Sequence, residues 1–103
     1  MRTIPQSCIS KSLPLEDGSS IVLVEMAGDT HSLPDDEVSY NVYRIAPDGS
    51  VLWQISAAPP VRPRTPFTNI YFAAGGLRAG RFDCYEHAVD LETGQSVIHD
   101  YLK

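Results

Sequence analysis

The feature that most constrains the fold of this chain is a turn of Pro47, Asp48 and Gly49 between two runs rich in β-branched and aromatic residues. Proline presets the backbone for a type I turn, aspartate suits the next position, and glycine accepts the left-handed conformation that follows. This sequence is typical of a three-residue hairpin loop with a glycine bulge. Residues 41–55 are therefore predicted to form a β-hairpin beside which the other strands are laid.

The register of this hairpin decides which of its side chains share a face. Counting back from the loop pairs Ile45 with Val51 and Tyr43 with Trp53. An aromatic pair flanked by β-branched residues stabilises a sheet, so this face is expected to lie in the core. The alternative for Trp53, the only tryptophan, is a binding site, because aromatic residues also anchor interfaces.

The remaining sequence predicts further strands and almost no helix, because no stretch shows sustained helical periodicity. Residues 21–27 form an apolar, β-branched run that is expected to be buried on both faces. Residues 28–37 are predicted to be a loop, with Asp35, Asp36 and Glu37 solvated rather than bound to calcium. The other expected strands are a short edge strand near 3–9 and strands at 69–73, 77–82, 85–90 and 95–102. The predicted fold class is all-β, an antiparallel meander of six to seven strands that forms a sandwich or half-barrel.

Length and composition bound the class of protein. A chain of 103 residues, 43% hydrophobic and 20% charged, is typical of one globular domain spanning residues 1–103. Its net charge of −5 opposes binding to nucleic acids and anionic membranes, both of which favour a basic surface. No stretch approaches the roughly 20 apolar residues of a membrane span, and the first residues lack the apolar run of a signal peptide. A cytoplasmic location is therefore expected.

The two cysteines are expected to be reduced thiols. Cys8 and Cys84 suit a reducing compartment and lack the spacing of a metal site. Cys84 is predicted to be buried in a strand between apolar neighbours. No nucleophile elbow, phosphate-binding loop or dinucleotide motif occurs in the sequence.

Two histidines lie on strands joined by one turn, so the length of that turn decides whether they can share a metal ion. A three-residue loop places His87 opposite His99. A four-residue loop places His87 opposite Ile98 and Glu86 opposite His99, on different faces. An aspartate before a Thr-Gly turn favours the four-residue loop, since Asp90 can then accept hydrogen bonds from loop amides. No metal and no cofactor are therefore expected.

A proline-rich segment is the clearest candidate for a binding loop. Residues 57–66 contain four prolines within eight positions and are expected to be extended and semi-rigid. Arg62 and Arg64 within this segment could bind a carboxylate or an acidic partner as forked donors. The alternative is a strap that covers a sheet edge. The predicted binding residues are Arg62, Arg64 and, on a neighbouring strand, Arg78.

Two stretches carry a resemblance to a known architecture. Residues 41–55 combine two strands, an Asp-Gly turn and a tryptophan, and residues 77–102 combine paired hairpins with an aspartate before a Thr-Gly turn. Both resemble single blades of quinoprotein-type and WD-type β-propellers. The resemblance implies propeller-blade-like hairpins. Propellers need at least four blades, so two blades imply that this chain does not close a propeller alone.

The sequence favours a small, soluble, non-enzymatic binding protein that homo-oligomerises, with a dimer as the first choice. One variant is an acidic inhibitor or immunity-type protein that covers a basic target. The competing class is a small enzyme with a pocket between the sheet and the Pro/Arg-rich loop. An enzyme should have a deep pocket with convergent polar groups and shifted pKa values, whereas a binding module should have an apolar-centred patch.

Overall fold

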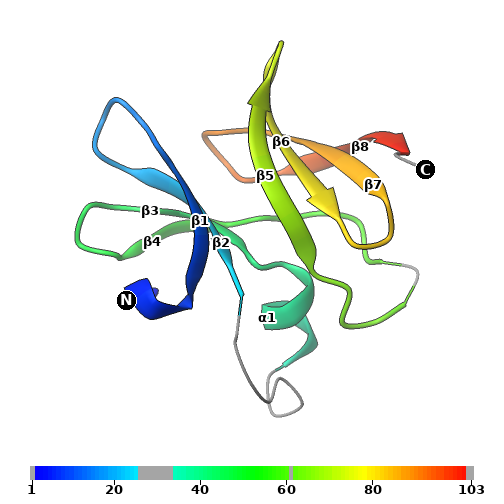
Figure 1. The fold of residues 1–103 in the computed structure, drawn as a ribbon, viewed down its shortest axis with the longest axis horizontal. Coiled ribbons are helices and arrows are strands. Elements are labelled where there is room, and N and C mark those ends of the chain that lie inside the picture. The colour runs from blue at the N-terminus through cyan, green and yellow to red at the C-terminus, as the bar shows by residue number, and fades with distance from the viewer. Residues whose placement is uncertain (1, 26–33, 61, 102–103) are drawn as a thin grey trace.

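The strands of this chain form two antiparallel sheets of four strands each (Figure 1). The computed structural model describes residues 2–25, 34–60 and 62–101. In chain order the elements are η1 (Gln6–Cys8), β1 (Ile9–Pro14), β2 (Ser20–Val24), α1 (Asp35–Ser39), β3 (Val42–Ile45), β4 (Val51–Gln54), β5 (Phe67–Ala73), β6 (Gly76–Arg81), β7 (Tyr85–Val89) and β8 (Ser96–Tyr101). The all-β antiparallel prediction is confirmed. The predicted number of six to seven strands is wrong, because the described residues contain eight.

The additional strand is β1, where the sequence predicts only a short edge strand near residues 3–9. Gln6–Cys8 instead forms a 3₁₀ turn, and Thr3 makes an isolated bridge to Ser50. β1 is an edge strand of the first sheet, and most of its side chains are exposed. An exposed edge strand of this kind lacks the apolar pattern that reveals a strand in sequence.

The acidic triplet also differs from its prediction. Asp35, Asp36 and Glu37 form the first turn of α1 rather than a loop. Negative side chains in a first helical turn are favourable because they lie near the positive end of the helix dipole. Residues 28–33 of the predicted loop lie outside the described residues.

The first sheet has the strand order β1-β2-β3-β4, and its inner strand β2 is buried on both faces. Ile21 and Leu23 of β2 face the second sheet and belong to the core between the sheets, whereas Val22 packs on the opposite side with Ile4. Val22 is fully buried, because the segment around Ile4 covers that outer face. The prediction that residues 21–27 are buried on both faces is confirmed for Ile21, Val22 and Leu23, whereas Glu25 is exposed and residues 26–27 lie outside the described residues.

The β3–β4 hairpin has the predicted turn but not the whole predicted register. Gly49 has φ 88°, and Ile45 pairs with Val51, as expected. A bulge then shifts the ladder, so that Trp53 pairs with Arg44 and not with Tyr43. The predicted Tyr43–Trp53 pair is therefore wrong. Trp53 lies in the core between the sheets, and Tyr43 packs on the outer face with Ile4.

The core reading of Trp53 is confirmed. Its side chain is buried and packs among apolar residues of both sheets. Its indole Nε1–H donates to the carbonyl oxygen of Leu91 at 2.8 Å, in the loop between β7 and β8. Gly94 of the same loop approaches the indole ring so closely that an added Cβ would lie 2.5 Å from Cε3. The β7–β8 loop therefore joins the second sheet to the first.

The second sheet has the strand order β5-β6-β7-β8. His87 pairs with Ile98, as the four-residue loop predicts, and Asp90 accepts the Glu92 N–H at 2.8 Å. A bulge at His99 then pairs Glu86 with Asp100, so the predicted Glu86–His99 pair is wrong. This bulge inserts one extra residue into β8 and shifts every later pair by one position.

The turn between β6 and β7 corrects the prediction for Cys84. This residue has φ 72° in the turn and is partly exposed, so it is not buried in a strand. The Asp83 carboxylate accepts the N–H of Tyr85 at 3.2 Å, which fixes the tight turn without a glycine. Both Cys8 and Cys84 are free thiols.

The proline-rich segment connects the two sheets, and we call residues 55–60 and 62–66 the connector. Its first part runs along the start of β8, where Ser56 N–H donates to Gly94 O at 2.9 Å and Ser96 N–H donates to Ser56 O at 2.8 Å. Arg81 holds the next part by donating to Ala58 O at 2.8 Å. The connector therefore covers the first residue of the β8 edge, as the strap alternative predicts.

Candidate functional site

Exposed apolar side chains are concentrated in the second sheet. Among the described residues, five of the six large exposed hydrophobic side chains belong to it, namely Phe72, Phe82, Val97, Ile98 and Tyr101. Only Leu52 belongs to the first sheet. Phe82 is 72% exposed and Tyr101 is 48% exposed. Apolar side chains that gather in one region of a surface mark contact sites more often than scattered ones do.

Strand pairing shows which face carries the exposed aromatic residues. His87 is buried in edge contact with Phe67, and cross-strand partners lie on the same face, so Ile98 faces the same way as His87. Tyr85, two residues before His87, and its partner Tyr101 share that face as well. We call Phe82, Tyr85, Ile98 and Tyr101 the aromatic overhang.

The overhang exists because the first sheet covers only part of the second. The first sheet approaches through β1 and β2, which lie against β5, and β8 is at the opposite edge of the second sheet (Figure 1). The core-facing side of the second sheet therefore continues past its cover. Side chains that would be core residues elsewhere in this face are left in contact with solvent.

A hollow of about 350 Å³ opens within the aromatic overhang. Its aromatic lining consists of Phe82, Tyr85 and Tyr101, and the rings of the two tyrosines are tilted at 51° with centroids 4.8 Å apart. Arg62 and Thr65 of the connector form one wall, and Asp83 of the β6–β7 turn lines it from a different segment. We call this space the aromatic hollow. It has an apolar centre with one cation and one acid at its rim.

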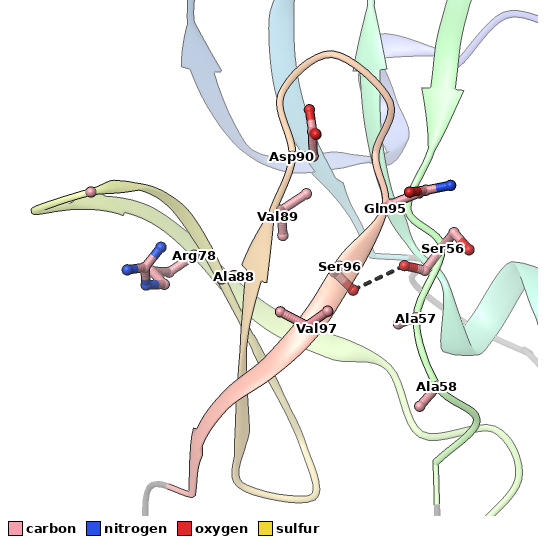
Figure 2. Close-up of a pocket in the computed structure, with 11 residues that line it drawn as sticks. Ser56, Ala57, Ala58, Arg78, Ala88, Val89, Asp90, Gln95, Ser96 and Val97 are labelled. Atoms are coloured by element: carbon pink, nitrogen blue, oxygen red, sulfur yellow. Dashed lines mark hydrogen bonds between the residues drawn. The ribbon is translucent and has the colours of Figure 1, made fainter.

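A second hollow, of about 610 Å³, lies at the other end of β8, and Figure 2 shows its lining. It lies between the start of the connector and the β7–β8 hairpin, where Ser96 Oγ donates to Ser56 O at 2.9 Å. Val97, Ala57 and Ala58 supply much of its apolar surface, and Arg78 lines its far side.

The three predicted binding arginines lie in three different places. Arg62 is exposed in the aromatic hollow. Arg64, with φ 61°, donates to Asp35 of α1 at 3.0 Å and lines a separate hollow beside the prolines. Arg78 is buried, with Nε 3.8 Å from Oε1 of Glu86. The fold therefore does not bring these arginines together, and of the three only Arg62 lines the aromatic hollow.

The charge of Arg78 is already opposed within the chain. Glu86 is buried beside it and also accepts a short hydrogen bond from the hydroxyl of Tyr71. That bond to Glu86 raises the pKa of Tyr71, because losing the proton would break it and place two negative charges together. These three side chains make a polar cluster on the outer face of the second sheet.

Residues 7–101 match the family model described as Domain of unknown function (DUF7957). The chain belongs to the DUF7957 family. The matched range includes every strand of both sheets that the structure describes. No curated protein and no solved structure matches this DUF7957 chain. Function must therefore be argued from its surface and its buried groups.

Two buried titratable groups of the DUF7957 chain, Arg81 and His87, lie in its core and not in its hollows. Arg81 donates to Ala58 O and to Ser39 O at 3.1 Å, and its guanidinium carbon lies 4.6 Å from the ring centroid of Phe67. Burial lowers the pKa of His87, and the nearby charge of Arg81 lowers it further. Neither residue lines the hollows described above.

The described part of the DUF7957 chain shows neither a metal cluster nor a membrane helix. Within it, no three side chains of the His, Cys, Asp and Glu types gather as a metal site. No helix in the described ranges is long and apolar enough to cross a membrane.

Sequence reasoning found Arg62 but missed the aromatic residues around it. Tyr85 meets Tyr101 only because the bulge at His99 shifts the β7–β8 register. Without the bulge, Tyr85 would face Asp100. Phe82 is 72% exposed in the β6–β7 turn, and exposure is a tertiary property with no local sequence signal.

Proposed function

We propose that this chain is a non-enzymatic binding module whose contact surface is the aromatic overhang, and that its partner is a second copy of itself. The observation that carries the proposal is the exposure of Phe82 next to a hollow lined by Tyr85 and Tyr101. Burying apolar surface in an interface contributes about 25 cal/mol of favourable free energy per Å². Aromatic residues in such a patch are the usual anchors of protein interfaces.

The character of the hollows supports binding over catalysis. The aromatic hollow is centred on apolar rings and is open to solvent, with Arg62 and Asp83 at its rim. The groups whose pKa is displaced by burial or by a charged neighbour, such as His87 and Tyr71, lie outside it. An active site for acid–base chemistry brings such groups together in the pocket.

The outer faces of the sheets favour a two-fold dimer over a closed ring of chains. We also propose that each sheet resembles a propeller blade and that the two sheets pack as a sandwich. The four-stranded meander of each sheet supports this proposal. A ring would pack blades face to face. The outer face of the second sheet carries the polar cluster of Tyr71, Arg78 and Glu86. The outer face of the first sheet is already covered by the segment around Ile4. Two-fold association is also the commonest arrangement of homo-oligomers.

A cytoplasmic location is part of the same proposal. Free thiols at Cys8 and Cys84 support it, because disulfides are rare in reducing compartments.

Molar mass in solution tests the proposed dimer. We expect light scattering coupled to size exclusion to give a mass that rises from one chain toward two as the concentration increases through the micromolar range. Phe82→Lys should abolish this rise, because it places a charge in the apolar centre. Leu52→Lys is the matched control, since Leu52 is 54% exposed on the first sheet and should leave the rise intact. A mass of one chain at every concentration would contradict self-association.

A further inference from the structure

We infer that the second copy binds by reciprocal insertion, with Phe82 of each chain entering the aromatic hollow of the other and Arg62 pairing with Asp83 of the second copy. This inference rests on the proposed function and specifies its geometry. It requires that one patch be complementary to itself under a two-fold rotation.

The shape of the aromatic overhang meets this requirement. Phe82 lies in the β6–β7 turn and is the most exposed large apolar side chain among the described residues. Its ring forms one side of the hollow of about 350 Å³, whose other aromatic lining is Tyr85 and Tyr101. A protruding ring next to an aromatic-lined hollow can be matched by a rotated copy of the same patch. Each chain then supplies one protrusion and one recess.

The charges at the rim of the aromatic hollow are also compatible with a two-fold rotation. Arg62 lies on the connector, and no ion pair of its guanidinium is found within the described residues. Asp83 lies on a different segment, where one of its carboxylate oxygens accepts the N–H of Tyr85. Across the described ranges, Asp83 likewise has no ion pair within 4.0 Å. In the inferred dimer the two-fold axis passes between Arg62 and Asp83, so that each Arg62 lies opposite the Asp83 of the second copy.

Backbone pairing along β8 is the less favourable way to join two copies. The N–H of Ser96 is already bonded to Ser56, and the bulge at His99 interrupts the rest of the strand. A covered end and a bulge are both devices by which sheets avoid edge-to-edge pairing. The β8 edge is therefore partly protected from strand pairing, and side chains carry the contact instead.

The size of the patch predicts a weak dimer. Aromatic side chains bury roughly 150–250 Å² each when fully covered, and those of the overhang are already partly covered by their own chain. Such a patch falls at the low end of interface sizes, below about 1,200 Å². The rim pair contributes mainly to orientation, because exposed ion pairs are individually weak.

Charge reversal tests the geometry. Arg62→Glu and Asp83→Arg should each raise the dimer dissociation constant, measured by sedimentation equilibrium, by about tenfold, because every homodimer contains two altered pairs. An equimolar mixture of the two variants should form heterodimers as tight as the wild-type dimer, since both pairs are again opposite in sign. The double variant R62E/D83R should also dimerise, and it keeps the net charge of the parent chain.

Two controls separate this effect from general charge and from folding. Lys11→Glu changes the net charge as Arg62→Glu does, but on β1, and should leave the dissociation constant within about twofold, because surface charges outside an interface are largely screened. Asp83→Asn keeps an acceptor for the Tyr85 N–H and removes the charge, so it should weaken the dimer without unfolding the turn. Circular dichroism melting checks that each variant is folded.

The outcomes distinguish the inference from the proposed function. If Phe82→Lys abolishes the dimer but the mixture of charge variants shows no recovery, the chain self-associates through another arrangement, and reciprocal insertion is wrong. If the wild-type chain is monomeric throughout, the proposed self-association fails, and the inference fails with it.

Discussion

The two sheets of this molecule have the same number of strands and the same meander order but very different surroundings. In the first sheet, Val22 on one face and Ile21 on the other are both fully buried. In the second, only one face meets a core, and that face continues into the exposed aromatic overhang. The comparison shows that β2 of the first sheet is buried on both faces, whereas most of the large exposed apolar side chains among the described residues belong to the second sheet.

The β7–β8 loop belongs to the second sheet but stabilises the first. The carbonyl oxygen of Leu91 accepts hydrogen bonds from both Trp53 Nε1 and Arg44 Nη1, each at 2.8 Å. Arg44 also bonds to Asp17 in the β1–β2 turn. Breaking this region should therefore damage both sheets, whereas changes to the exposed overhang should leave the fold intact.

The largest effect on stability is expected for Trp53→Ala. Removing a buried aromatic side chain typically costs about 3–5 kcal/mol in the free energy of unfolding. Urea denaturation followed by far-ultraviolet circular dichroism measures the change. Leu52→Ala, at the neighbouring exposed position, should change stability by less than about 0.5 kcal/mol. Equal losses at the two positions would contradict the burial of the indole.

An intermediate effect is expected for Gly94→Ala, compared with Gly49→Ala. Both glycines have positive φ, 78° and 88°, so both changes carry the conformational cost of a left-handed alanine. Only at Gly94 would the new Cβ meet Trp53, whereas the nearest atom at Gly49 lies 3.6 Å away. Gly94→Ala should therefore cost about 1–3 kcal/mol more. Similar melting temperatures for the two variants would show that Gly94 is not closely packed against the indole ring of Trp53.

The smallest effect on stability is expected from acidification, and it arises from His87, which is buried in the second sheet. Burial and the charge of Arg81 lower the pKa of His87 from its ordinary value of 6.5. As the pH falls below 6.5, the unfolded chain takes up a proton that the folded chain does not, so the free energy of unfolding decreases until the pH reaches the folded pKa. Melting temperatures above and below pH 6.5 measure this decrease.

The exposed His99 provides the control for this titration. His87→Gln should flatten the fall in melting temperature, whereas His99→Gln should leave it unchanged. If His99→Gln removed the pH dependence of the melting temperature, the attribution of that dependence to His87 would be wrong. Direct titration of the two imidazole resonances by nuclear magnetic resonance gives an independent check.

Turn chemistry was predictable from the sequence, but ladder irregularities were not. The Asp-Gly signal located the turn of Gly49 and the Thr-Gly signal located the loop of Gly94, because a turn depends on a few adjacent residues. The bulges that separate Tyr43 from Trp53 and shift His99 satisfy packing between distant segments. Cys84 adopts the left-handed conformation without being glycine, so its turn gave no signal. The site was predictable only at Arg62, because its aromatic lining depends on one bulge and on the limited cover of the first sheet.

The bonds of Arg81 have a kinetic consequence. Its guanidinium donates to Ser39 O and Ala58 O and lies over Phe67, so it fixes the connector to the second sheet from within. Thr65 of the hollow's wall is held as well, because its N–H donates to Ser39 Oγ at 3.1 Å, so this part of the wall is in place without a partner. Complexes that need no loop ordering avoid that entropic cost on binding and associate faster than those that do. A dimer built on this wall should form and separate rapidly, with its lifetime set by the few aromatic contacts and not by rearrangement of the chain.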